Sequence, residues 1–277
     1  PYSSLLRQIV NENGGDGTVR VPAANLNAIG ATLDFRNAGE NPVVTPWTRR
    51  CEADFPLAVL PCRTHASIIE PDGGDIDDET PAQKRQLGDL ILEALGCGDW
   101  AAYRRIQQNW FRISEDTAKP QNNDFYHQYC QMNVFVVDDH GAPVKDYFLE
   151  FTAPDYQTSD TATVYFHNNV IEDVHPNAIN PASRCVYIDR TDLMNGYYPR
   201  IPSPLEKTVT MSLSANAPGN NVHYFSNSNT GAKGEFKLHS EDTEGERWLK
   251  RNTTHFVKII IPRMPLEQVF RLRLYGG

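Results

Sequence analysis

The sequence predicts two units of different fold class. An α/β unit over residues 1–120, incomplete in this chain, is followed by an all-β antiparallel sandwich over residues 121–277. Helical and strand patterns alternate in the first part, and short strand-like runs dominate the second. Between them, near residue 120, the polar and proline-containing stretch KPQNND breaks the pattern.

Length and composition indicate a soluble globular protein. At 277 residues the chain exceeds the usual size of a single domain, which favours two packed units. The net charge of −9 and the pI near 5.4 argue against DNA or RNA as a partner. No window is apolar enough to be a transmembrane segment. The sequence does not distinguish a cytoplasmic from a secreted location.

The first part contains three expected helices and two expected strands. The stretch 80–96 has Thr80 at a helix N-cap, Pro81 at the first helical position and Gly96 after the end, so its start and stop signals agree. Further helices are expected at 3–10 and 98–114. Strands are expected at 31–35 (ATLDF) and at 55–61 (FPLAVLP), an apolar run bounded by prolines.

The second part reads as eight or nine short strands without a helical period between them. Runs such as QMNVFVVDD, DYFLEFTA, TATVYFHN, KTVTMSLSA and HFVKIIIP are rich in β-branched and aromatic residues and are separated by turn residues. This pattern is typical of an antiparallel sandwich.

Two residues of the first part are candidates for catalysis. Asp16 lies between glycines in NGGDGTVR, where it fits a turn as well as a functional carboxylate. His65 follows the apolar run 55–61, so it is expected at the rim of a sheet, where α/β folds hold their active sites. A carboxylate that accepts a hydrogen bond from one imidazole nitrogen fixes the tautomer and lets the other nitrogen act as a base.

These residues carry a resemblance to a known family. DGTVRVPAANL resembles the segment that holds the triad acid in lipase-like α/β-hydrolases, and RTHASII resembles the loop that holds their histidine. The order acid, then histidine, agrees with that family. The resemblance covers residues 1–96. It implies that Asp16 orients His65, that the helix at 80–96 closes the domain, and that the substrate is a carboxylic ester, with lipids and phospholipids ahead of small esters. It implies no cofactor and no metal.

The chain departs from the family at the nucleophile. The motif G-x-S-x-G is absent, and the serine-rich stretch MSLSANAPG (211–219) reads as a strand that enters a turn. The serine, the oxyanion hole and the early strands are therefore expected on a segment before Pro1 or on a second chain. A unit with only two convincing strands needs such a partner to bury its core.

Other interpretations stay open beside this one. Cys62 could act as a nucleophile with His65, and the acidic loop 70–79 could bind Ca²⁺. Arg20 and Arg63 could bind an anionic head group, and Tyr197 with Tyr198 could form a contact surface. The remaining histidines have no metal-binding spacing. The main alternative function is a non-catalytic β-sandwich module for binding or adhesion with a short α/β lead-in. A third is a subunit of a toxin-like or secreted assembly in which the sandwich docks the enzyme to its carrier.

Overall fold

The computed structural model describes residues 19–36, 42–49, 53–61, 65, 81–119, 127–154, 160–216, 222–224, 234–239 and 248–265. The chain divides into two compact units. The first comprises Pro1–Ala28, Arg49–Cys130 and Arg251–Thr254, and the second comprises Ile29–Thr48, Gln131–Lys250 and His255–Gly277. The chain passes between the units several times. The assignment of residues 1–120 and 121–277 to two domains stays a prediction.

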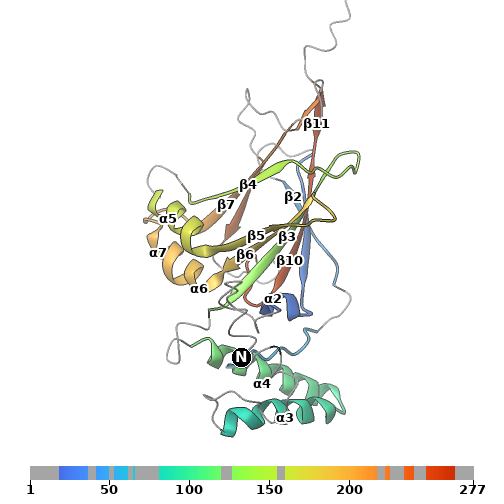
Figure 1. Cartoon of the computed structure of the whole chain (residues 1–277), viewed down its shortest axis with the longest axis vertical. Helices are drawn as coiled ribbons and strands as arrows, with labels where there is room; N and C mark the ends of the chain where they lie inside the picture. Colours follow the sequence, from blue (N-terminus) through green and yellow to red (C-terminus); the bar gives the residue numbers. More distant parts are fainter. Residues whose placement is uncertain are drawn as a thin grey trace, which may run out of the picture. The chain divides into compact units, whose positions relative to one another are not determined.

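The described helices of the first unit are α2 (Val21–Ala24), α3 (Pro81–Leu95) and α4 (Trp100–Thr117) (Figure 1). The helices expected at 80–96 and 98–114 are thus confirmed. The Asp99 carboxylate caps α4 by accepting a hydrogen bond of 2.7 Å from the amide of Ala102. The helix expected at 3–10 lies outside the described residues. Within the described ranges, no helix is long and apolar enough to cross a membrane.

The strand expected at 55–61 is wrong. Residues 54–60 have no regular secondary structure, and their side chains are half-buried apart from the exposed Phe55. Their backbone groups bond instead to side chains, most of them from α4. The apolar run between prolines resembles a buried strand in sequence, because periodicity does not reveal which groups satisfy the backbone.

The second unit is built on a six-stranded sheet in the order β2-β1-β10-β3-β6-β5. The strands are β1 (Ile29–Asp34), β2 (Val43–Pro46), β3 (Tyr129–Asp138), β5 (Ile171–Pro176), β6 (Ser183–Asp189) and β10 (Thr254–Ile261). β1 pairs in parallel with β10, with Leu33 opposite Ile259, whereas β2 runs antiparallel to β1 and β5 runs antiparallel to β6. Both Leu33 and Ile259 are fully buried. The sheet is therefore mixed.

Two smaller sheets complete the described strands. β4 (Tyr147–Thr152), β7 (Thr208–Ala215) and β9 (Gly234–His239) form an antiparallel sheet with β7 in the centre. β8 (Val222–Tyr224) pairs with β11 (Arg263–Pro265). Residues 211–215 of the serine-rich stretch 211–219 belong to β7, so the prediction of a strand is confirmed as far as Ala215.

The all-β antiparallel sandwich expected for residues 121–277 is not confirmed. Its largest sheet includes β1 and β2, which come from before residue 120, and one of its pairs is parallel. The run TATVYFHN, expected as a strand, is helical: α5 (Asp160–Tyr165) continues into the π-helix η2 (Phe166–Val170). A second helical stretch contains α6 (Arg190–Asp192), η3 (Leu193–Tyr197) and α7 (Tyr198–Arg200).

Aromatic packing explains why tertiary structure overrides strand propensity in these helical stretches. The ring of Phe166 lies 5.1 Å from that of Tyr197 and 5.5 Å from that of Phe151, measured between centroids. Tyr197 and Tyr198 are both buried, and the hydroxyl of Tyr197 donates to the carbonyl of Thr208 over 2.8 Å. The contact surface suggested for these tyrosines is therefore wrong, because they belong to the core.

A buried ion pair holds the turn after β3. The Asp138 carboxylate accepts hydrogen bonds from the Arg263 guanidinium and from the amides of His140 and Ala142. Burial alone would raise the pKa of Asp138, but the bonds from Arg263 and the two amides hold that pKa below its ordinary value. Asp138 thus stabilises the folded state in its charged form.

We expect Asp138→Asn to lower the free energy of unfolding by about 1–3 kcal/mol, because it removes the charge that these donors stabilise. The difference from the wild type should be complete above the ordinary pKa of 3.8 and should shrink as the pH falls below it. Chemical denaturation across that range measures it. Asp116→Asn, which alters an exposed pair with Lys119, is the control and should change stability little. An equal effect of both variants would contradict this assignment.

Candidate functional site

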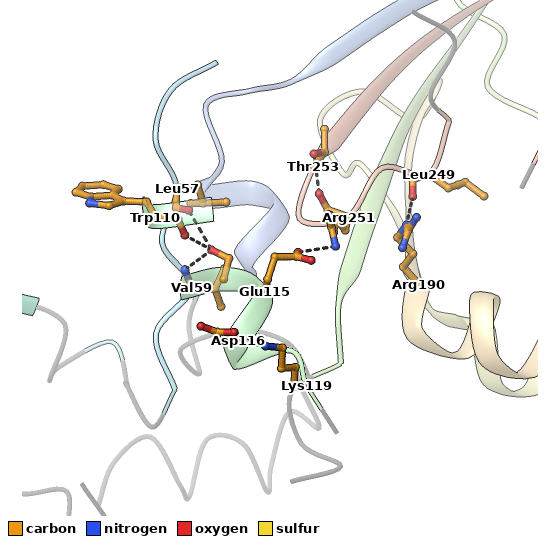
Figure 2. A network of polar contacts seen from close by, with 11 residues as sticks. Leu57, Val59, Trp110, Glu115, Asp116, Lys119, Arg190, Leu249, Arg251 and Thr253 are labelled. Carbon is orange, nitrogen blue, oxygen red and sulfur yellow. Dashed lines mark hydrogen bonds and ion pairs between the residues drawn. The ribbon is translucent and has the colours of Figure 1, made fainter. Parts of the chain in front are cut away.

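The residues before His65 form a segment, 53–61, fixed by side chains of the first unit. The hydroxyl of Ser114 on α4 accepts a bond of 2.9 Å from the amide of Val59 and lies 3.0 Å from the carbonyl of Leu57 (Figure 2). The hydroxyl of Thr117, one turn further along α4, donates to the carbonyl of Val59 over 2.8 Å. Helix α4 therefore supplies hydrogen bonds to the backbone of this segment, as a neighbouring strand would in a sheet.

The start of the segment is held in the same way. The carbonyl of Asp54 accepts bonds from the Tyr103 hydroxyl at 2.9 Å and from the Gln107 amide at 2.8 Å, both on α4. The Asn27 side chain accepts a hydrogen bond of 2.6 Å from the amide of Phe55 and donates one of 2.8 Å to the carbonyl of Phe55. The segment that leads toward His65 is thus tied to the residues that follow Asp16 in sequence.

The chain around Asn27 is itself anchored. The Asn25 side chain accepts from the amide of Asn27 over 2.9 Å and donates to the carbonyl of Asn252. The hydroxyl of Thr254 donates to the carbonyl of Pro22 over 2.7 Å. Residues 19–28, 53–61 and 251–254, far apart in sequence, therefore belong to one hydrogen-bonded group within the first unit.

Helix α4 also holds the 251–254 segment. The Arg251 guanidinium pairs with the Glu115 carboxylate over 2.5 Å and lies 5.0 Å from the centre of the Phe111 ring. Figure 2 shows Glu115 directed toward Arg251, while Leu57 and Val59 lie beside the same helix. One helix thus organises two of the three segments.

Of the two predicted catalytic residues, the structure describes His65. It is exposed in a turn four residues after Pro61, beyond the anchored segment. Asp16 lies outside the described residues, as do Cys62, Arg63 and the acidic loop 70–79. The pairing of Asp16 with His65 stays a prediction. Arg20 is half-buried, and its carbonyl accepts from the amides of Ala23 and Ala24 at the start of α2.

Several other histidines have structural partners. His255 is fully buried, and its Nε2 accepts from the amide of Lys250 over 3.0 Å. His167 bonds the carbonyl of Phe151 through Nε2 at 2.8 Å. His175 is exposed and lies 2.6 Å from the Asp173 carboxylate. These contacts agree with the interpretation of such histidines as structural.

Sequence analysis missed the organising role of Ser114. Its hydroxyl contacts the amide of Val59 and the carbonyls of Leu57 and Trp110, so its bonding capacity is used by the backbone. The available signal was the presence of Ser114 and Thr117 one turn apart in a helix that also carries large apolar residues. Buried hydroxyls on a helix need acceptors, and the adjacent segment supplies them.

Comparison with known proteins supplies a structural likeness. No protein-family model matches the chain, and no curated protein matches it. Two solved structures of phospholipase PlaB from Legionella pneumophila are similar. The first has a TM-score of 0.69 and 20% identity, covering 97% of this chain and 56% of that one. The second, in complex with thio-NAD, has a TM-score of 0.73 and 19% identity. It covers 100% of this chain and 59% of the phospholipase chain.

This likeness shows the fold. The chain shares its mixed α and β fold with the part of the two PlaB structures that it matches. It spans less than two thirds of the length of the phospholipase chains that it matches.

We expect Ser114→Ala to loosen the 53–61 segment. The substitution leaves the amide of Val59 without its acceptor, so hydrogen exchange across residues 57–60 should become faster by about tenfold or more. Mass spectrometry of exchanged peptides measures this. Ser212→Ala, on β7 of the second unit, is the matched control and should leave the segment unchanged. Unaltered exchange at 57–60 in Ser114→Ala would refute the role of this hydroxyl.

Proposed function

We propose that this protein is a serine hydrolase of the lipase or esterase type that cleaves carboxylic esters, with phospholipids as the preferred substrate class. Asp16 orients His65, and His65 is the general base and then the general acid. The nucleophilic serine and the oxyanion hole come from a preceding segment or from a second chain. The proposal includes the assignment of residues 1–120 to the C-terminal portion of an α/β-hydrolase domain and of 121–277 to an accessory β-rich domain.

The observation that carries this proposal is the paired hydrogen bonding between Asn27 and Phe55. It joins the chain that follows the predicted acid to the chain that precedes the predicted base. A carboxylate and an imidazole can act as a unit only if the segments that bear them are held together. The fold likeness to a phospholipase supports the same reaction class.

The proposed reaction divides hydrolysis into two steps. The seryl oxygen attacks the ester carbonyl carbon while its proton passes to the imidazole of His65, and the resulting imidazolium donates that proton to the departing alcohol. Water then attacks the carbonyl carbon of the acyl-enzyme while one of its protons passes to the same nitrogen. The imidazolium returns that proton to the seryl oxygen as the bond to the acyl group breaks, which releases the serine and a free carboxylic acid. Asp16 stabilises the imidazolium in both steps. Side chains supply every proton transfer, so the reaction requires no cofactor.

The alternative is a non-catalytic β-sandwich module for binding or adhesion. Most of the strands belong to the second unit, which favours a binding role for that unit. The two functions differ in one observable: the hydrolase requires His65, whereas the module does not.

We expect His65→Ala to reduce ester hydrolysis by about 10³-fold or more, because it removes the base that activates the serine. The assay uses the chain together with the segment or partner that bears the nucleophile. Because His65 is exposed, the thermal midpoint should change little. His175→Ala, another exposed histidine beside a carboxylate, is the matched control and should retain activity.

A fluorophosphonate probe separates the proposed parts. It should label the complete assembly on the segment that supplies the serine and leave the 277-residue chain unlabelled. Label on this chain would show that the nucleophile assignment is wrong, and full activity in His65→Ala would show that His65 is structural.

A further inference from the structure

The corner between α3 and α4 carries an exposed apolar surface that the fold does not use. At the end of α3, Leu92 is 68% exposed and Leu95 is 79% exposed, and Ile91 is also exposed. At the start of α4, Trp100 is 55% exposed. We call these four residues the corner surface. Leu92 and Leu95 lie three residues apart on one helix, so they share a face, and a four-residue connection brings Trp100 close to them.

Burying such side chains is a main source of folding energy, and soluble proteins rarely gather large apolar residues on the outside without a use. The two helices are already joined by other residues. Glu93 on α3 accepts hydrogen bonds from Asn109 at 3.1 Å and from Trp110 at 3.0 Å, both on α4. The exposure of the corner surface is therefore not the result of a missing contact between α3 and α4.

The part of α4 that follows Trp100 carries arginines. Residues 100–113 contain three arginines (Arg104, Arg105 and Arg112) and no acidic residue, in a chain whose net charge is −9. All three arginines are exposed. The Arg104 guanidinium lies 5.7 Å from the centre of the Trp100 ring, which itself stacks on Tyr103 at 5.1 Å. Apolar and cationic groups thus meet on the same part of α4. Acidic residues also lie near the corner surface. Asp89 on α3 and Asp99, directly before Trp100, are exposed, and the Asp99 carboxylate accepts the cap hydrogen bond from Ala102, as Glu93 accepts bonds from Asn109 and Trp110.

Exposed Trp and Leu residues beside arginines are typical of helices that lie in the interface of a membrane. The apolar side chains enter the boundary of the acyl chains, and the guanidinium groups bind phosphate oxygens of the head groups. A second copy of this chain fits less well, because both copies would bring Arg104 and Arg105 into the contact and each would bring one exposed carboxylate of the connection, Asp99. Acidic phospholipid head groups supply the opposite charge.

We propose that the corner surface, together with Arg104 and Arg105, docks this protein on the surface of a membrane that contains anionic phospholipid. The choice of a lipid occupant rests in part on the proposed lipid substrate. Docking concerns a different surface from His65 and goes beyond the hydrolytic reaction. It would hold the protein on the phase in which its substrate resides.

The test is sedimentation of the full chain with vesicles of phosphatidylcholine that contain about 30% phosphatidylglycerol. The wild type should bind these vesicles and should bind pure phosphatidylcholine more weakly. The double variant Leu92→Ser with Leu95→Ser should bind about tenfold or more weakly, because it removes apolar surface that enters the bilayer. The double variant Arg104→Gln with Arg105→Gln should lose the preference for the anionic lipid and its dependence on salt.

The control is Ile179→Ser, which removes an apolar side chain that is 96% exposed in the second unit and should leave binding unchanged. All variants alter exposed side chains, and circular dichroism verifies that they fold. Equal binding by the leucine double variant and the wild type would overturn the proposal, and so would the absence of wild-type binding. A change of oligomeric state in the leucine variant without loss of vesicle binding would assign the surface to contact between copies instead.

A second assay separates this proposal from the proposed function. Hydrolysis of a soluble short-chain ester by the complete assembly reports on the catalytic residues alone. Vesicle binding without hydrolysis would reject the hydrolase and keep the docking surface, whereas hydrolysis without vesicle binding would reject the docking surface and keep the hydrolase.

Discussion

The hydrogen bonds between helix α4 and the segment 53–61 are the constraint on which the first unit depends. A partly buried backbone segment that joins no sheet must find other partners for its amides and carbonyls. Ser114, Thr117, Tyr103 and Gln107 supply them from successive turns of α4, and Asn27 supplies them from the chain that follows the candidate acid. These bonds hold the backbone from Asp54 to Val59, which precedes His65 in the chain.

This arrangement gives α4 two separate roles. Its hydroxyl and amide side chains bind the segment 53–61, and Glu115 with Phe111 holds Arg251. Its N-terminal turn presents Trp100 and Arg104 to solvent. The inner role ties the helix to the segment that precedes His65 and to Arg251, and the outer role belongs to the proposed docking on a lipid surface. Both roles belong to the first unit, in which the candidate acid and base also lie.

Local signals predicted α3 and α4, but they missed the helical stretches 160–170 and 190–200 and did not identify the partners of the strands. The Thr80, Pro81 and Gly96 signals located α3, because helix boundaries depend on groups that are close in sequence. The parallel pairing of β1 with β10 joins residues more than two hundred positions apart, and alternation along one strand does not identify its neighbour. TATVYFHN has the composition of a strand, yet the buried packing of Phe166 against Phe151 and Tyr197 accompanies a helix. For the site, sequence suggested Asp16 and His65, whereas the support given by Ser114 and Asn27 could be seen only in three dimensions.

The central claim is that Asp16 and His65 act as one unit in ester hydrolysis. The most direct test is a double-mutant cycle on kcat/KM of the complete assembly, with Asp16→Asn, His65→Ala and both changes together. If the carboxylate works through the imidazole, each single variant should lose about 10³-fold or more, and the double variant should be little worse than His65→Ala. If the two losses multiply in the double variant, or if Asp16→Asn retains wild-type activity, the account of this pair is contradicted.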